Sequence, residues 1–252
     1  MPVREWDGAS YDRISGTMEK LGLPVLERLP LSGSETVLDA GCGSGRITEA
    51  LLERLPQGHV IAVDESASMI EAARERLGDA GGRLQLQVLD LLELDLHEEL
   101  DAIISTATFH WVKDHERLFA RLHAALRPGG RLIAQCGGAG NIDVLRGKAR
   151  AVLAGEPYAA HMADFVGPWN YATAEQTQQR LLAAGFQSAE CWLQPAPQEP
   201  EAPREFLTEI VLGPHYQHLP EDLREPFMDD VLEALGEPVV VDYVRLNIDA
   251  VR

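Results

Sequence analysis

Cysteine is scarce in this chain of 252 residues, which contains three. Cys42, Cys136 and Cys191 are an odd number at wide spacing, and no two of them form a C-x-x-C pair. This pattern excludes a disulfide framework and a cysteine-based zinc site, and it fits a reducing compartment. The histidines are also too scattered to show the spacing of metal ligands, so we expect no metal.

Basic residues are outnumbered by acidic ones. Lysine and arginine total 22 against 40 aspartates and glutamates, which gives a formal net charge of −18. Nucleic acids and anionic membranes bind to basic surfaces, so neither is an expected partner. The 45% of hydrophobic and 25% of charged residues are ordinary values for a globular protein. The acidic residues therefore belong to a folded chain and not to a disordered tail.

Long apolar runs are also absent. No stretch of the sequence reaches the roughly 18 apolar residues that a transmembrane helix needs. The first residues, Met1–Arg13, lack the apolar centre of a secretory signal. We therefore expect a cytoplasmic protein.

Short apolar runs alternate with helical patterns from about Glu35 to Cys136. Such alternation is typical of βαβ units, so it predicts an α/β fold with a parallel sheet. The spacing of Ser68 and Glu71 is that of a capping box and predicts a helix start at Ser68. The expected strands are residues 36–39, 59–63, 84–89, 101–106 and 131–136.

The rest of the chain is less regular. We expect a helix over 173–184 and strands over 186–193 and 239–252, with two insertions at 138–172 and 195–236. Within the second insertion, a helical stretch is expected to break at Pro214, Pro220 and Pro226. The insertions contain candidate pocket residues, although packing or a surface position is the favoured interpretation for each one. These residues are His161, Trp169, Tyr171, His215 and Tyr216.

The stretch from Asp39 to Gly45, with the sequence DAGCGSG, carries the most chemical information. It lies between an expected strand and an expected helix, where doubly wound sheets bind nucleotides. The glycines allow a tight turn and a close approach of the backbone to a ligand. A dinucleotide fingerprint fails here, because Arg46 and Thr48 stand where glycine or alanine would be needed. An acid at the front of the loop would repel phosphate but could hold an amino group, so the loop favours a nucleoside without a pyrophosphate.

Two further acids close the next strands: Asp64 ends the second and Asp90 ends the third. Together with the glycine loop, these residues resemble class I S-adenosylmethionine-dependent methyltransferases, and the resemblance covers most of the chain. Within that group the sequence looks closest to the trans-aconitate methyltransferase-like proteins. The resemblance implies that Asp64 binds the two ribose hydroxyls and that Asp90 binds the adenine amino group, with Leu91 beside the ring.

The resemblance also implies a cofactor, S-adenosyl-L-methionine, which leaves as S-adenosyl-L-homocysteine. The segment Trp6–Asp12 resembles the lid of the family, and Tyr11 is the aromatic residue expected to fold over the cofactor. The full set of expected cofactor-binding residues is Tyr11, Asp39, Gly41, Cys42, Gly43, Gly45, Asp64, Glu65, Met69, Asp90, Leu91 and Thr106.

The fold implied by the resemblance is a doubly wound, mostly parallel seven-stranded sheet of the Rossmann-like methyltransferase type, with an antiparallel final strand. We expect a single methyltransferase domain over residues 1–252. Its parts are an N-terminal helical lid over 1–34, a cofactor-binding core over 35–136, and a helical cap formed by the insertions 138–172 and 195–236.

His110 and Trp111 follow the fourth expected strand and are the candidate catalytic residues. An imidazole with an ordinary pKa near 6.5 could take a proton from a hydroxyl or an amine. An indole N–H could donate to a carboxylate oxygen. A His-Trp or Gln-Trp pair at this point resembles that of several carboxyl-methylating relatives. The competing interpretation is that Trp111 packs against the next helix and that His110 is an ordinary loop residue.

These observations predict a methyltransferase that acts on a small-molecule acceptor, with a carboxylate as the first hypothesis and in-line transfer as the mechanism. The alternatives are N- or C-methylation of another small metabolite, and a non-catalytic protein that binds S-adenosylmethionine. A nicotinamide-dependent oxidoreductase is disfavoured by Arg46. The expected assembly is a monomer or a homodimer.

Overall fold

The computed structural model describes residues 16–252, and side chains from residue 21 onward. Tyr11, together with the first part of the expected lid, lies outside the described residues. The chain divides into two compact units. Unit 1 contains the residues up to Ala139, Asn170–Gln194 and Arg245–Arg252, and unit 2 contains Gly140–Trp169 and Pro195–Val244.

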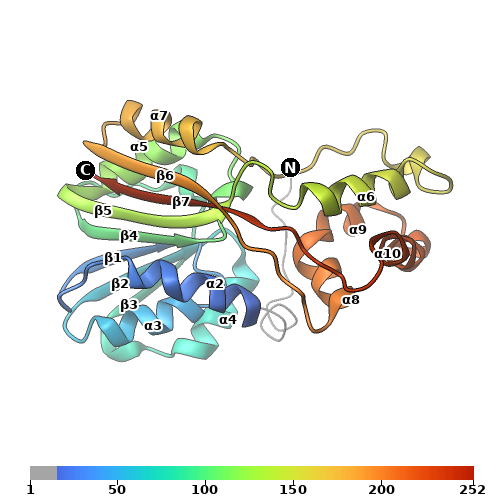
Figure 1. Cartoon of the computed structure of the whole chain (residues 1–252). Helices are drawn as coiled ribbons and strands as arrows, with labels where there is room; N and C mark the ends of the chain where they lie inside the picture. The colour runs from blue at the N-terminus through green and yellow to red at the C-terminus, as the bar shows by residue number, and fades with distance from the viewer. Residues whose placement is uncertain (1–15) are drawn as a thin grey trace. The chain divides into compact units, whose positions relative to one another are not determined.

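Unit 1 is built on one seven-stranded sheet (Figure 1). Four of its neighbouring pairs, from β3 through β2, β1 and β4 to β5, are parallel, and β7 runs antiparallel to β5. This arrangement confirms the predicted mostly parallel, doubly wound fold with an antiparallel final strand. The order across the sheet is β3 (Leu84–Val88), β2 (His59–Asp64), β1 (Thr36–Ala40), β4 (Leu100–Thr106), β5 (Leu126–Gly137), β7 (Val244–Val251) and β6 (Ser188–Pro195).

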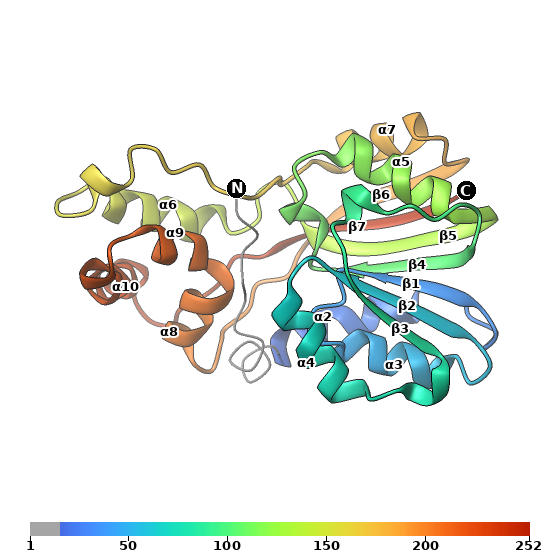
Figure 2. The same cartoon turned by 180° about the vertical axis from the view of Figure 1, so that it is seen from behind.

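Helices cover both faces of the sheet (Figures 1 and 2). One face carries α2 (Gly16–Glu27), α3 (Arg46–Arg54) and α4 (Ala67–Leu77), and the other carries α5 (His115–Ala125) and α7 (Ala174–Ala183). Alternate strand residues point to opposite faces, so Val37 belongs to the apolar core under α2 and α3, while Leu38 belongs to the core under α5 and α7. Both residues are fully buried, as expected for a parallel strand with helices on each side.

Short helices and caps set the ends of the central strands. The 3-10 turns in unit 1 are η1 (Ala80–Gly82), η2 (Leu91–Glu93) and η3 (Phe109–Trp111). Helix α4 begins at Ala67 with Ser66 as its N-cap, so the capping box predicted at Ser68 is wrong by two positions. The reason is that the Ser66 hydroxyl, which is buried, accepts the N–H of Met69 at 3.4 Å, a bond that the local spacing did not reveal.

Unit 2 is helical apart from one isolated bridge between Gln198 and Val241. Its elements are α6 (Asp143–Leu153), η4 (Ala159–His161), α8 (Pro203–Phe206), the π-helical turn η5 (Leu207–Val211), α9 (Gly213–His218) and α10 (Glu221–Leu235). Pro214 and Pro220 stand at helix starts, but Pro226 lies inside α10, so the break predicted there is wrong. The final strand begins at Val244 and not at Val239. The role of unit 2 as a cap remains a prediction.

None of the helices within residues 16–252 combines the length and the apolar character that crossing a membrane requires.

Candidate active site

The loop between β1 and α3 follows the predicted glycine pattern. Gly41, Gly43 and Gly45 have φ angles of 82°, 53° and 84°, a region that other residues rarely adopt. The N–H groups of Gly41 and Cys42 both donate to the carbonyl oxygen of Val63 at the end of β2, at 2.8 and 2.9 Å. The loop is therefore pinned to the neighbouring strand, and Gly45 serves as the N-cap of α3.

The three glycines face different surroundings. A Cβ at Gly41 would lie 2.2 Å from the Thr108 hydroxyl, and a Cβ at Gly45 would lie 2.9 Å from Leu77. A Cβ at Gly43 would meet nothing within 4 Å. Gly41 and Gly45 therefore allow close packing within the protein, whereas Gly43 presents bare backbone to open space.

Replacing Gly41 by alanine is expected to destabilise the protein by about 2–4 kcal/mol, because the new methyl group meets Thr108 at a backbone angle that alanine disfavours. Thermal unfolding measures the effect. Gly129→Ala is the matched control: Gly129 has a φ of 80° but nothing within 4 Å, so its substitution should cost only about 1 kcal/mol. Equal losses in the two variants would contradict the role of the contact with Thr108.

Asp39 is 1% exposed and lies at the end of β1. Its Oδ2 accepts the Thr48 hydroxyl at 2.7 Å, while its Oδ1 is buried without a hydrogen-bond partner. Burial raises the pKa of Asp39 to about 7, even though the bond from Thr48 acts in the opposite direction, and the charge of Asp64 adds to the rise. An unpaired buried carboxylate oxygen is costly, so Asp39 is poised to receive a donor or a cation.

Asp64, at the end of β2, is half-buried and holds two loops together. Its Oδ2 accepts the N–H of Gly43 and its Oδ1 accepts the N–H of Ser66, both at 3.0 Å. Burial raises the pKa of Asp64, and the two N–H groups partly offset that effect. Each oxygen keeps a second lone pair for a further donor.

More acidic and apolar groups lie around the ends of β2 and β3. Loss of hydration and the charges of Asp90 and Asp64 raise the pKa of Glu65, so these three carboxylates are electrostatic neighbours. Asp90 is exposed and caps η2 through the N–H of Leu92 at 2.9 Å. Leu91 and Met69 are 5% and 3% exposed, which makes them apolar parts of this otherwise acidic region.

The end of β4 is tied to the glycine loop. The Ser105 hydroxyl donates to the carbonyl oxygen of Ala40 at 2.6 Å. The Thr108 hydroxyl lies 3.2 Å from the carbonyl oxygen of Gly41 and 3.0 Å from that of Thr106. The carboxyl ends of β1 and β4 therefore form one connected edge of the sheet, as expected for parallel neighbours.

His110 is 8% exposed and fixed from several sides. Its Nδ1 accepts the N–H of Gly137 at 3.3 Å, and its carbonyl oxygen accepts the N–H of Asn170 at 2.7 Å. Its ring stacks on Tyr171 with centroids 5.8 Å apart and lies 5.1 Å from the half-buried ring of Trp111. Because Nδ1 accepts a hydrogen bond, the proton of a neutral ring resides on Nε2.

The charge state of His110 follows from its surroundings. Burial, and then the positive charges of Arg245 and His115, hold the pKa of His110 well below its usual range. The ring is therefore neutral at pH 7. It offers an Nε2–H donor, and its Nδ1 is already engaged, which makes it a better hydrogen-bond donor than a base.

Arg245 is a residue that sequence analysis missed. It is 4% exposed and pairs with Gly137 across β5 and β7. Its Nε donates to the side chain of Gln135 at 3.3 Å, and Gln135 in turn donates to Asn247 at 2.9 Å. The strand pairing thus brings a buried guanidinium close enough to His110 to act on its charge state.

Thr48 and Thr108 were also missed, and only Thr48 has a sequence signal. Thr48 falls on the buried, apolar face of the helix after the glycine loop, where a hydroxyl group needs a hydrogen-bond partner. Thr108 contacts the glycine loop, and Arg245 lies near His110. Both relations join segments far apart in the sequence, so local spacing does not predict them.

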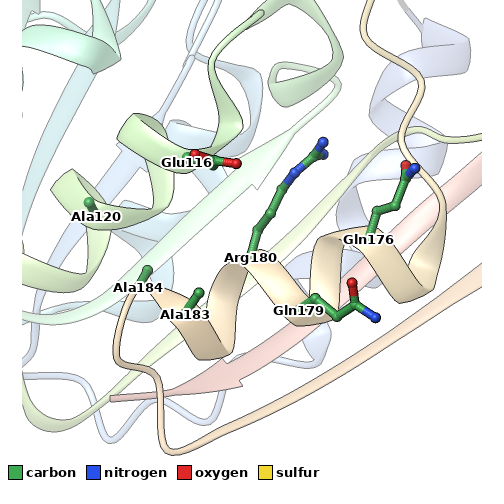
Figure 3. Close-up of a pocket in the computed structure, with 7 residues that line it drawn as sticks. All are labelled: Glu116, Ala120, Gln176, Gln179, Arg180, Ala183 and Ala184. Carbon is green, nitrogen blue, oxygen red and sulfur yellow. The ribbon is translucent and has the colours of Figure 1, made fainter.

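A separate surface pocket of about 490 Å³ lies along α5 and α7 (Figure 3). None of the predicted site residues lines it. Its Arg180 approaches Nδ1 of His115 at 3.4 Å, and Nε2 of His115 lies 2.9 Å from the carbonyl oxygen of Phe109 in η3. The lining residues are Glu116, Ala120, Gln176, Gln179, Arg180, Ala183 and Ala184.

Among the described residues, no three histidine, cysteine or acidic side chains come together in a way that could hold a metal ion.

Comparison with known proteins identifies the fold and the family. Residues 37–130 match a family described as a methyltransferase domain. A trans-aconitate 2-methyltransferase from Variovorax paradoxus is 30% identical over 96% of this chain and 94% of its own length. An uncharacterized methyltransferase from Schizosaccharomyces pombe is 30% identical over 74% of this chain and 72% of its own length.

A solved structure supports the fold. Phosphoethanolamine N-methyltransferase 2 from Haemonchus contortus, in complex with S-adenosyl-L-methionine, matches with a TM-score of 0.63. The two are 20% identical over 97% of this chain and 56% of the other. The strand order of the sheet, the glycine loop after its central strand and the similar proteins therefore all indicate the same family. The chain belongs to the class I S-adenosylmethionine-dependent methyltransferases, and S-adenosylmethionine is its cofactor.

Proposed function

We propose that this enzyme methylates an oxygen of a small organic carboxylate. The observation that carries the proposal is the environment of His110, a neutral imidazole with Nδ1 engaged, beside the buried guanidinium of Arg245. A carboxylate is already ionised at pH 7 and needs no base to activate it. A buried cation and an N–H donor are the groups that would bind it.

The residues of the glycine loop fit the cofactor. Gly43 would let the ligand approach the backbone, because nothing lies within 4 Å of its Cβ position. The unpartnered Oδ1 of Asp39 would accept from the cofactor's amino group. Asp64 would bind the ribose hydroxyls with its remaining lone pairs, Asp90 would bind the adenine amino group, and Leu91 and Met69 would pack against the ring.

The bound cofactor supplies an electrophilic methyl carbon on a positively charged sulfur. Arg245 would hold the acceptor carboxylate, and the Nε2–H of His110 would donate to the same group, so that one carboxylate oxygen faces the methyl carbon. In-line transfer to that oxygen would break the carbon–sulfur bond of the cofactor, and the electron pair of that bond would stay on sulfur. No proton is transferred. The contribution of these side chains is positioning and the exclusion of water.

The relatives suggest the first acceptor to test. A trans-aconitate 2-methyltransferase is similar to this chain along nearly its whole length, so trans-aconitate is the first candidate. The assay incubates the enzyme with cofactor carrying a labelled methyl group and identifies the product by mass spectrometry. A methyl ester releases labelled methanol in alkali, which an N-methyl or C-methyl product does not do. Transfer to an amine but to no carboxylate would refute the proposal.

Replacing Arg245 by methionine is expected to lower kcat/KM for the carboxylate about 30-fold, mainly through KM, because one charge-assisted contact is lost. Cofactor affinity should change less than about twofold, since Arg245 is assigned to the acceptor. Arg28→Met is the matched control. Arg28 donates to Asn247 at 2.7 Å, so it belongs to the same polar network but is separated from Arg245 by Gln135 and Asn247. Equal losses of kcat/KM in both variants would show that the network, and not the charge of Arg245, matters.

A further inference from the structure

A second group of basic and aromatic side chains lies entirely within unit 2. The guanidinium carbon of Arg146 stands 5.2 Å from the ring centroid of Trp169. The Trp169 ring lies 5.4 Å from that of His215, which lies 4.6 Å from that of Phe165. The ring centroids of Phe165 and His218 lie 5.1 Å apart. The five side chains therefore form a continuous series of cationic, aromatic and imidazole groups.

His215 is the buried centre of this series. It is 4% exposed, and its Nδ1 has no hydrogen-bond partner. The rings of Phe165 and Trp169 pack against His215, and both belong to the first segment of unit 2, Gly140–Trp169. A ring face offers at most a weak partner to an imidazole N–H, and a buried polar atom without a full hydrogen bond is costly. The arrangement therefore calls for a polar ligand atom at Nδ1.

The local charge selects the sign of that ligand. Burial is the largest cause that lowers the pKa of His215 to about 4, and the positive charges of Arg146, Arg150 and His218 add to it. No acidic side chain contributes to this shift. This neighbourhood is basic although the whole chain has a net charge of −18. It favours an anion, for which the neutral His215 would donate its Nδ1–H.

We propose that Arg146 and His215 form a binding site for an organic carboxylate in unit 2, with Trp169 and Phe165 as its aromatic walls. A guanidinium and a single N–H donor match the two oxygens of one carboxylate. The aromatic rings of Phe165 and Trp169, both packed against His215, fit a planar apolar body better than a compact, strongly hydrated phosphate. The site does not depend on the acceptor proposed above, because it is argued only from residues of unit 2.

The test follows the side-chain NMR signals of His215 in the full-length protein during titration with benzoate, a planar carboxylate. A saturable shift of these signals is expected, and its absence would overturn the proposal. Arg146→Gln should weaken benzoate binding at least about tenfold. Arg150→Gln is the matched control. It removes the same charge one turn later on α6 from an exposed position, and it should change the affinity less than about twofold. Equal losses would indicate general charge attraction and would overturn the site.

Two substitutions at His215, both followed through the fluorescence of Trp169, separate the nitrogen from the packing. His215→Asn keeps an N–H donor near the position of Nδ1 and should retain benzoate binding within about threefold, whereas His215→Phe keeps the ring packing and should lose about tenfold or more. Undiminished binding by His215→Phe would refute the role of Nδ1. Inorganic phosphate should give no saturable response, and phosphate binding as tight as that of benzoate would overturn the carboxylate assignment.

Discussion

Replacing Asp39 by asparagine is expected to stabilise the cofactor-free protein at pH 8 while weakening its binding of S-adenosylmethionine about 100-fold. The two effects have opposite signs because they depend on the same buried charge. The amide oxygen of the new side chain would still accept the Thr48 hydroxyl, which bonds Oδ2 of Asp39 at 2.7 Å in the native protein. The variant therefore removes the charge and keeps the local contact.

The stability effect follows from the pKa of Asp39. Its value of about 7 in the folded protein lies above the ordinary 3.8. The contribution of protonated Asp39 to the free energy of unfolding is therefore fully present below pH 3.8 and is lost as the pH rises through 7. Asparagine has no such loss. The gain should be absent near pH 4 and reach at most about 4 kcal/mol above pH 7, which corresponds to several degrees in Tm. Thermal unfolding at the two pH values measures it.

The binding effect has a pH signature. A cationic ligand favours the ionised form of Asp39, so the affinity of the native protein for the cofactor should fall about tenfold for each pH unit below 7. In Asp39→Asn the affinity should be low and independent of pH over the same range. Calorimetric titration between about pH 5.5 and 7.5 avoids ionisation of the cofactor's own amino group. A variant that is less stable at pH 8, or that keeps the native pH slope, would contradict the proposed state of Asp39.

Replacing Asp64 by asparagine is expected to weaken cofactor binding about 1000-fold, the largest effect on affinity that we predict. The two ribose hydroxyls would lose a charged acceptor, and each such bond contributes about 1.5–3 kcal/mol. An amide also cannot accept from both Gly43 and Ser66, as the native carboxylate does at 3.0 Å. The substitution therefore removes the ligand contact and loosens the loop at the same time.

Asp79→Asn is the matched control for this measurement. Asp79 accepts the N–H of Gly81 at 3.0 Å, the same kind of local bond, at an exposed turn that contains no predicted site residue. Its affinity for the cofactor should equal that of the native protein within about twofold. Circular dichroism and thermal unfolding establish that Asp64→Asn is folded. A folded Asp64→Asn protein with unchanged affinity would show that the ribose is bound elsewhere.

Most strands of unit 1 can be predicted from local sequence patterns. The alternation of apolar runs and helical stretches predicts the parallel strands, because each βαβ unit has its own periodicity and its own turn residues. Small errors in the predicted helix ends arise where two nearby side chains could each form the capping hydrogen bond. Ser66, and not Ser68, caps α4. Pro226 within α10 shows the same limit, since packing of the helix overrides the local tendency of proline to break it.

The candidate site divides in the same way. The sequence by itself determined the glycine loop, the acid that ends β2, the acid that follows β3 by two residues, and the position of His110 after β4, because these features depend on short spacing within one segment. Only the tertiary structure decided that Asp39 is buried with an unpartnered oxygen and that His110 is neutral. It alone brought Arg245 opposite Gly137, through an antiparallel pairing between strands more than a hundred residues apart. The physical reason is that burial and long-range pairing set the charge state of a group, and neither is a property of the residue's neighbours in sequence.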